Sequence, residues 1–332
     1  MRIAIVKLSA LGDIVHAMFV LQLIKKSNNE ISIDWVVEEK FKGLLDSHPQ
    51  INQVHSVNLR NAKKKKSIYL LYKELKKFKK LEPFDLVIDM QGLIKSALIS
   101  KFIPSKQTIG FDKFSARESI ASSFYDKKFH CKYDKNVILR NIELIEFSLR
   151  GRLDKKQIDK KNSYLYSNEQ ELNVRLSESK KNILLVPGAS HKSKRYPTFK
   201  FVEITKLIDA NFLVVWGNNE ERNLANQIKE NSPKVHICNK LSIGSLINLI
   251  SEVNLVIGPD TGPTHMAWAL NVPSIMLFGS TPGFRNSYQT SINRIIESKS
   301  NVNPLKIQKD DFSIEEISPR KILKVYQDLF NL

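Results

Sequence analysis

The chain has 332 residues, 42% of them apolar, and a formal net charge of +18. This length suits two domains of ordinary size, and this apolar content excludes a wholly disordered protein. Its two cysteines, Cys131 and Cys238, are too few for a disulfide framework or a multi-cysteine metal cluster, which favours a reducing, cytoplasmic compartment. The first long apolar stretch, 3–24, is interrupted by Lys7 and Asp13, so it indicates neither a signal peptide nor a membrane span.

Short apolar strands alternate with helical patterns along the chain. In the first half we expect strands at 1–7, 31–37 and 84–89, with a helix over 14–24. After a polar stretch at 151–181, the same alternation restarts with strands at 182–186, 212–216, 235–237, 254–257 and 274–278, and a final helix over 318–332. Continuous apolar strands between amphipathic helices indicate parallel sheets that are covered on both faces. The sequence therefore predicts two α/β domains joined by a polar linker.

The positive charge is concentrated in one segment of the first half. Residues 60–82 contain ten Lys or Arg and only two acidic residues. Within this segment Ile68, Leu71, Leu75 and Phe78 recur at helical spacing, so the lysines are expected on the outer face of an amphipathic helix. Such a face favours an anionic partner, namely nucleic acid, anionic lipid or a phosphorylated substrate. A solvated surface in a chain rich in Lys, Asn and Ile explains the total charge equally well.

The loops that follow the strands are the candidate sites, because open parallel sheets bind ligands at the carboxyl ends of their strands. The sequence contains no G-x-G-x-x-G after a strand and no G-x-x-x-x-G-K-[ST], which argues against a dinucleotide oxidoreductase and a P-loop NTPase. It also lacks H-E-x-x-H or a comparable His/Asp cluster with the spacing of a metal site.

Two of these loops carry residues suited to acid–base chemistry and to phosphate binding. Asp13 follows the first strand, where it either caps the next helix or offers a carboxylate to a substrate hydroxyl. The segment G-P-D-T-G-P-T-H at 258–265 follows a strand and begins a helix, and amide and hydroxyl donors at a helix N-terminus suit a phosphate. A second glycine-containing loop, 279–283, follows the next strand and is expected to lie close by.

Two further loops suggest nucleotide contacts. Lys194 follows the strand at 182–186 and could neutralise a diphosphate, while Ser190 in the same loop could donate to the same oxygens. Lys194 is also one lysine among many. A carboxylate in W-G-N-N-E-E at 216–221 is placed to bind ribose hydroxyls, or simply begins a solvated helix.

Taken together, these motifs resemble the lipopolysaccharide heptosyltransferases of glycosyltransferase family 9. The resemblance covers nearly the whole chain and is carried by the stretches 5–16, 89–97, 110–118, 194–197, 216–217 and 260–265. The stretches Q-G-L-I-K-S-A and G-F-D-K-F-S-A-R-E point to type I of this family rather than type II. The resemblance implies a GT-B fold with two Rossmann-like parallel-sheet domains facing each other across a cleft. It places an acceptor domain at 1–165, a donor domain at 180–310, and a helical segment, 311–332, that packs back toward the N-terminal domain.

The implied reaction is an inverting transfer of L-glycero-D-manno-heptose from ADP-heptose to the inner Kdo of Kdo2-lipid A, in assembly of the lipopolysaccharide inner core. By position, Asp13 corresponds to the catalytic base. The residues that correspond to donor-binding positions are Ser190, Lys194, Glu221, Leu241, Asp260, Thr261, Gly262 and His265, with Glu220 as the alternative to Glu221. Arg117 is an acceptor-binding candidate inside a matched stretch, and Arg60 and Arg140 are candidates outside one. Two departures from the family's motifs affect how the donor is expected to bind. Ala189 stands where a hydroxyl residue is expected, and Pro263 stiffens the donor loop.

The resemblance further implies no obligatory cofactor or metal ion, and a location at the cytoplasmic face of the inner membrane. There the basic segment would attract both the acceptor and the anionic bilayer. No nucleic-acid or protein partner is expected. The alternatives are a type II transfer to an already heptosylated acceptor, a basic nucleic-acid-binding protein, and a sugar-nucleotide epimerase. Sparse aromatic residues in the lysine run disfavour the second, and the epimerase's expected carboxylate and histidine set is missing.

Overall fold

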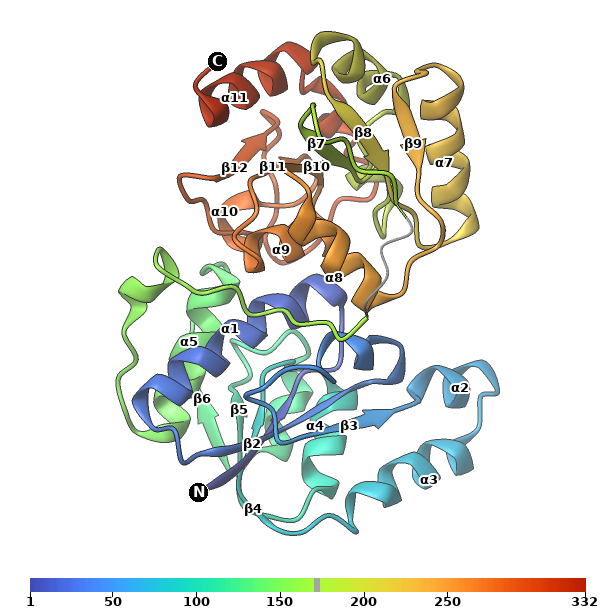
Figure 1. Ribbon diagram of the computed structural model, residues 1–332. Coiled ribbons are helices and arrows are strands. Elements are labelled where there is room, and N and C mark those ends of the chain that lie inside the picture. Colours follow the sequence, from blue (N-terminus) through green and yellow to red (C-terminus); the bar gives the residue numbers. More distant parts are fainter. Residues whose placement is uncertain (170–173) are drawn as a thin grey trace. The chain divides into compact units, whose positions relative to one another are not determined.

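The chain folds into two compact units, Met1–Lys160 and Lys161–Leu332 (Figure 1). The computed structural model describes residues 1–169 and 174–332, without the side chains of Arg60, Ala62, Lys63, Ile68 and Leu71. The first unit ends earlier than the expected boundary at residue 165. Residues after Lys160 belong to the second unit because the Tyr164 amide donates to the Ala269 carbonyl at 3.3 Å and Asn271 donates to the Lys161 carbonyl at 2.9 Å.

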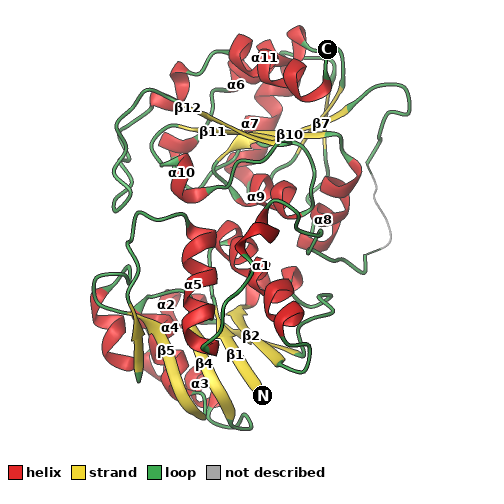
Figure 2. Cartoon of the chain, turned by 90° about the vertical axis from the view of Figure 1, so that its left-hand side faces the viewer, coloured by secondary structure: helices red, strands yellow, loops and turns green. Residues whose placement is uncertain are grey.

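The first unit is built on one parallel sheet. Its strands are β1 (Arg2–Val6), β2 (Ser32–Glu38), β3 (Gln53–Val57), β4 (Phe84–Asp89), β5 (Ser105–Phe111) and β6 (Lys127–Phe129). Its α-helices are α1 (Leu11–Ser27), α2 (Leu59–Lys64), α3 (Ile68–Phe78), α4 (Ile94–Phe102) and α5 (Val137–Leu149), and its 3₁₀ helices are η1 (Glu39–Leu44), η2 (Ser119–Phe124) and η3 (Lys155–Ile158). The strand order is β3-β2-β1-β4-β5-β6, and every pairing is parallel. Helices α1 and α5 cover one face of the sheet, and α3 and α4 cover the other (Figures 1 and 2).

The amphipathic helix expected in the basic segment is confirmed as α3. It begins after Ser67, whose hydroxyl accepts a hydrogen bond from the Leu70 amide at 3.2 Å and so caps the helix. Leu75 and Phe78 are buried in the core of the first unit, together with apolar residues of β1 and β4. The lysines of the helix are exposed, namely Lys73, Lys76 and Lys77.

The second unit repeats the same architecture. Its strands are β7 (Asn182–Leu185), β8 (Asn211–Val214), β9 (Val235–Ile237), β10 (Leu255–Pro259), β11 (Ser274–Phe278) and β12 (Asn293–Glu297). Its α-helices are α6 (Thr198–Leu207), α7 (Asn219–Glu230), α8 (Ile243–Glu252), α9 (Gly262–Ala269), α10 (Gly283–Asn286) and α11 (Pro319–Phe330), and its 3₁₀ helices are η4 (Lys192–Lys194) and η5 (Ser313–Glu316). The strands are parallel in the order β12-β11-β10-β7-β8-β9. Figure 2 shows α6, α7 and α11 on one face of this sheet and α8 and α9 on the other.

The last helix, α11, belongs to the second unit, and the expectation that the C-terminal segment packs back toward the N-terminal domain stays a prediction. Helix α11 packs against α6 and β11 of the second unit. Ile322 and Tyr326, one turn apart on α11, are buried in the apolar core of that unit. Burial of this apolar stripe is what fixes the helix, so the segment is part of the second domain.

Both sheets have the strand order of a doubly wound fold, which confirms the expected α/β class. In such a sheet the chain reverses its direction of travel between two central strands, and ligands bind beyond their carboxyl ends. The reversal falls between β1 and β4 in the first unit and between β7 and β10 in the second. Among the described residues, no helix is both long and apolar enough to cross a lipid bilayer.

Candidate active site

Asp13 lies at the carboxyl end of β1, the position where the first sheet reverses direction. It occupies the first turn of α1 and is exposed to solvent. Its Oδ2 accepts a hydrogen bond from the Ala10 amide at 3.1 Å, as the side chain does in a capping box. Both functions proposed for Asp13 are therefore compatible, because one oxygen supports the helix terminus while the other remains available to a ligand hydroxyl.

Asp260 is the centre of a cluster in the second unit. It directly follows β10 and is 7% exposed. The Lys194 Nζ lies 2.8 Å from its Oδ2, and the His265 Nε2 lies 2.9 Å from its Oδ1. Burial alone would raise the pKa of Asp260, but the Lys194 ammonium and the His265 imidazole hold this pKa well below its usual range. Asp260 is therefore a carboxylate at neutral pH, and it fixes the positions of one cation and one imidazole.

Two residues that were not predicted complete this cluster. The Thr281 hydroxyl donates to Asp260 Oδ2 at 3.0 Å, and the Asn286 amide donates to the same oxygen at 3.2 Å. Thr281 comes from the loop 279–283, so the expected proximity of that loop is confirmed. Its neighbour Ser280 is buried and donates to the Ser193 carbonyl at 3.3 Å. Asn286 carried no sequence signal, because it lies on the short helix α10 outside any motif.

The N-terminus of α9 lies directly beside this cluster. Thr261 immediately precedes the helix, Gly262 is its first residue, and both are partly exposed. The Thr261 amide donates to the Thr264 hydroxyl at 3.3 Å, which fixes the first turn. Pro263 occupies the first turn, where a missing amide hydrogen costs no intrahelical bond. A helix N-terminus attracts anions, and the Lys194 ammonium, paired with Asp260, lies beside this end of α9 at the carboxyl edge of the second sheet.

The structure distinguishes Glu221 from Glu220. Glu220 is bound by Arg195, with hydrogen bonds of 2.6 and 2.9 Å to its two carboxylate oxygens. Glu221 instead accepts from the Gly217 amide at 2.7 Å and packs against Gly188, where an added Cβ would lie 2.5 Å from the Glu221 carboxyl carbon. Glu221 thus connects the loops after β7 and β8 at the same edge of the sheet as Lys194.

The other predicted donor residues occupy the same edge. Ser190 is exposed on the loop after β7, next to Ala189, which is buried and whose carbonyl accepts from the Arg195 guanidinium at 3.3 Å. Leu241 is half-buried on the loop that follows β9. The structure therefore brings all eight donor-binding candidates to the carboxyl edge of one sheet.

The three acceptor candidates differ in their surroundings. Arg117 is exposed on the loop after β5, so its guanidinium can reach a ligand. Arg140 is 5% exposed, and its guanidinium donates to the backbone carbonyls of Cys131 and Ser115 at 3.1 and 2.7 Å. These bonds give Arg140 a structural role in the first unit and leave its guanidinium poorly placed to contact an acceptor. The side chain of Arg60 lies outside the described residues.

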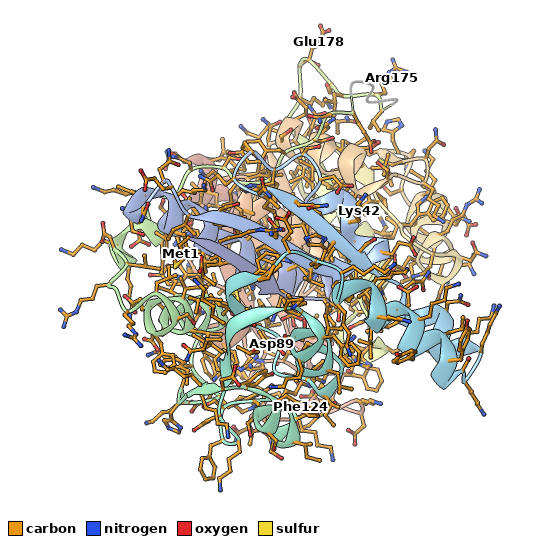
Figure 3. All side chains as sticks on the ribbon, turned by 90° about the horizontal axis from the view of Figure 1, so that it is seen from below. Met1, Lys42, Asp89, Phe124, Arg175 and Glu178 are labelled. Carbon is orange, nitrogen blue, oxygen red and sulfur yellow. The ribbon has the colours of Figure 1, made fainter. Side chains whose placement is uncertain are left out.

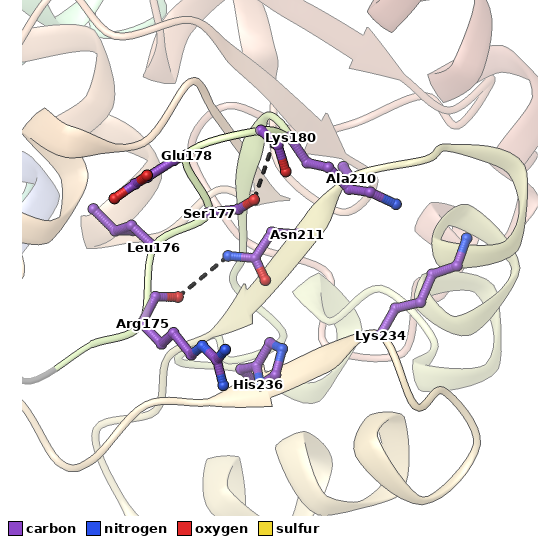
Figure 4. A pocket seen from close by; sticks show the side chains of 10 residues that line it. Arg175, Leu176, Ser177, Glu178, Lys180, Ala210, Asn211, Lys234 and His236 are labelled. Carbon is purple, nitrogen blue, oxygen red and sulfur yellow. Dashed lines mark hydrogen bonds between the residues drawn. The ribbon is translucent and has the colours of Figure 1, made fainter.

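A shallow groove lies at the opposite, amino edge of the second sheet. It has a volume of about 740 Å³ and is lined by residues 175–180, 210, 211, 234 and 236. Figure 4 shows the Asn211 amide donating to the Arg175 carbonyl across this groove. Arg175 and Glu178 are exposed at the periphery in Figure 3, and Lys180 is paired with Asp209 at 2.6 Å. The groove is remote from the cluster around Asp260 and shares none of its residues.

Two doubly wound sheets, each with polar side chains where the chain reverses, define a two-domain Rossmann-type α/β protein. The chain belongs to glycosyltransferase family 9 (heptosyltransferase), whose model matches residues 71–311. It is 39% identical to lipopolysaccharide heptosyltransferase 1 of Campylobacter coli over 99% of each chain. It is 28% identical to lipopolysaccharide heptosyltransferase 1 of Escherichia coli K12, over 87% of this chain and 91% of that one. The solved E. coli heptosyltransferase WaaC with ADP has the same fold, with a TM-score of 0.80, 22% identity and coverage of 99% of this chain and 100% of that one. These similarities confirm the GT-B expectation for the fold and the assignment as a glycosyltransferase.

Proposed function

We propose that this heptosyltransferase moves L-glycero-D-manno-heptose from ADP-heptose to the inner Kdo of Kdo2-lipid A, with inversion at the anomeric carbon. The observation that supports ADP-heptose as the donor is the Lys194–Asp260–His265 cluster beside the N-terminus of α9. This cluster is suited to binding a diphosphate. Support for this donor and for type I transfer comes from the full-length similarity to the relatives named lipopolysaccharide heptosyltransferase 1.

In the proposed reaction, Asp13 accepts the proton of a Kdo hydroxyl while that oxygen bonds to the anomeric carbon of the heptose. The bond from this carbon to the diphosphate breaks on the opposite face, and ADP leaves with the electron pair. Negative charge therefore grows on the diphosphate, where Lys194 and the first amides of α9 stabilise it. These cationic groups allow transfer without an obligatory metal ion.

The remaining donor contacts follow from the shared edge of the second sheet. Glu221 binds the ribose hydroxyls and Leu241 packs near the adenine. Ser190, Thr261 and Gly262 donate to the phosphate oxygens. Asp260 acts chiefly by orienting Lys194 and His265, since four groups already bind its two oxygens. Arg117 contacts the acceptor.

The direct test is a mass-detected transfer assay with ADP-heptose. One acceptor is Kdo2-lipid A, and the other is Kdo2-lipid A that already carries one heptose. We expect addition of one heptose to the first acceptor only, with turnover retained in EDTA. Addition to the second acceptor alone would replace this proposal with type II transfer, and loss of turnover in EDTA would reveal a required metal ion.

A separate prediction distinguishes the two glutamates. We expect Glu221→Ala to weaken ADP binding about 10-fold or more, because a hydrogen bond to a charged group contributes about 1.5–3 kcal/mol. Glu220→Ala is the matched control, since Glu220 is 54% exposed and its pair with Arg195 is a surface ion pair. Calorimetric titration with ADP measures both affinities. Equal weakening by the two substitutions would contradict the assignment of the ribose contact to Glu221.

We also propose that the basic segment draws the enzyme to the anionic cytoplasmic face of the inner membrane, where the acceptor resides. Lys64, Lys65 and Lys66 are exposed at the end of α2 and just after it, while the side chain of Lys63 lies outside the described residues. Lysines near an anionic surface contribute about 1 kcal/mol each to membrane binding.

Replacing Lys64, Lys65 and Lys66 by Gln should therefore lower the affinity for phosphatidylglycerol vesicles by about 100-fold, as measured by co-sedimentation. The KM for the acceptor should rise, and the affinity for ADP should stay unchanged. The control removes the same charge elsewhere, by replacing the exposed Lys206, Lys240 and Lys306 by Gln. Equal losses in both variants would assign vesicle binding to net charge rather than to this segment.

A further inference from the structure

The loop that precedes Asp13 is short and is anchored at several points. It runs from the end of β1 at Val6 to the start of α1 at Leu11. Its backbone connects directly to the candidate base, because the Ala10 amide donates to Asp13 Oδ2 at 3.1 Å. Displacement of residues 8–10 therefore displaces the carboxylate. The groups that hold this loop are candidates for control of the reaction.

Gln91 makes the central contact with this loop. Its side-chain Oε1 accepts hydrogen bonds from the amides of both Leu8 and Ser9, each at 3.1 Å. A single oxygen thus fixes two successive peptide groups just before Ala10 and Asp13. Gln91 lies two residues beyond the end of β4, the strand that pairs with β1 where the first sheet reverses direction.

The backbone of Gln91 is itself held by a buried carboxylate. Asp89 Oδ1 accepts from the Gln91 amide at 2.8 Å and from the Gly92 amide at 3.3 Å. Its Oδ2 accepts from the Tyr125 hydroxyl at 2.7 Å, and Asp89, labelled in Figure 3, is completely buried. Gly92 has a φ of 66°, a conformation that glycine adopts without strain. Hydrogen bonds to Asp89 therefore fix the backbone from which the Gln91 side chain reaches the loop.

Two lysines hold the same loop from either side. Lys7 is buried and its Nζ donates to the Met90 carbonyl at 3.0 Å. The Lys95 Nζ donates to the Ser9 hydroxyl at 3.3 Å and to Glu38, at the end of β2, at 3.0 Å. The loop is thus tied to the ends of both strands that flank β1. Within the part of the chain that the structure describes, Gln91 is the side chain that binds two of the loop's amides.

We propose that Gln91 is a positioning residue that sets the place and orientation of the Asp13 carboxylate. This inference rests on the proposed function, in which Asp13 is the base. Gln91 touches the backbone of the loop and acts on the reaction only through Asp13. Small displacements of a reacting group are costly, since a shift of about 1 Å lowers rates by about 100-fold.

The test replaces Gln91 by Met, which has similar size but no oxygen for the two amides. We expect kcat for heptosyl transfer to fall about 10–100-fold with the ADP affinity unchanged. Gln91→Glu keeps an oxygen for both amides and should retain most of the activity. Gln107→Met is the matched control, because Gln107 is a half-buried glutamine on β5 of the same sheet with no such contact.

Two readouts separate positioning from general destabilisation. Hydrogen exchange should show lost protection at the Leu8 and Ser9 amides in Gln91→Met, while the amides of the central strands stay protected and the protein stays folded at the assay temperature. In an Asp13→Asn background, Gln91→Met should cause little further loss, because both residues act through one carboxylate. Wild-type kcat in Gln91→Met, or an equal fold-loss in both backgrounds, would overturn the inference. Failure of the proposed function shows differently, as a wild-type protein that transfers no heptose to Kdo2-lipid A.

Discussion

Asp13→Ala should lower heptosyl transfer by about 10²–10⁴-fold, the usual contribution of a positioned general base. The acceptor hydroxyl is a weak nucleophile until its proton is removed, and Asp13 is the exposed carboxylate where the first sheet reverses direction. ADP-heptose binding should persist, since the proposed donor contacts lie on the second unit. Single-turnover transfer and donor titration on the same preparation measure the two quantities.

Asp13→Asn is the companion variant that separates the two roles of this side chain. The Asn amide oxygen can still accept from the Ala10 amide, as Asp13 Oδ2 does at 3.1 Å, so the start of α1 is preserved. An amide does not accept a proton at neutral pH. A loss of activity shared by both variants therefore identifies proton transfer. Near-normal turnover in Asp13→Asn would show that Asp13 serves only as a helix cap.

The central strands could be predicted from the sequence because burial on both faces requires continuous apolar runs. Strands β4 and β11 were predicted at their observed bounds for this reason. Strands β3, β5, β6 and β12 were not. Strand β3, at the sheet edge, has only two apolar residues among its five, and β6 has three residues of which two are lysines. Edge strands need less apolar surface, so the sequences of these two resemble loops. The edge strand β9, which has two apolar residues in three, was predicted at its observed bounds.

The candidate site was predictable only as a set of loops. Lys194 and Asp260 each belong to a sequence motif. Their ion pair, however, depends on the pairing of β7 with β10, which no local pattern specifies. Arg140 is a residue whose burial the sequence did not indicate. An arginine outside any motif looks like a surface cation, whereas the fold buries it over the Phe111 ring at 4.6 Å and surrounds it with backbone carbonyls. Gln91 belonged to a matched stretch whose sequence gives no hint of its two amide contacts.

Lys194→Met should have the second large effect, on both activity and stability. In the proposed reaction Lys194 faces the departing diphosphate, and loss of such a cation should lower kcat by about 10²–10³-fold. The substitution also leaves a buried carboxylate without its cation. We expect a loss of about 3 kcal/mol in the free energy of unfolding, the lower end for a broken buried ion pair, because His265, Thr281 and Asn286 still bind Asp260.

The pH dependence of this loss follows from the depressed pKa of Asp260. A carboxylate whose pKa is lower in the folded protein stabilises the fold above its unfolded pKa, and this stabilisation disappears as the pH falls through the folded value. Without Lys194, burial raises the folded pKa. Acid unfolding of Lys194→Met should therefore begin at a higher pH than in the wild type, as measured by thermal melting between neutral and acidic pH.

The double variant Lys194→Met, Asp260→Asn separates catalysis from stability. Replacing both members of a buried ion pair removes the uncompensated charge, so the melting temperature and its acid dependence should recover toward the wild type. Transfer activity should not recover, because no cation then faces the diphosphate. If the double variant regained activity together with stability, Lys194 would have only a structural role, and stabilisation of the leaving ADP would rest on the N-terminus of α9 alone.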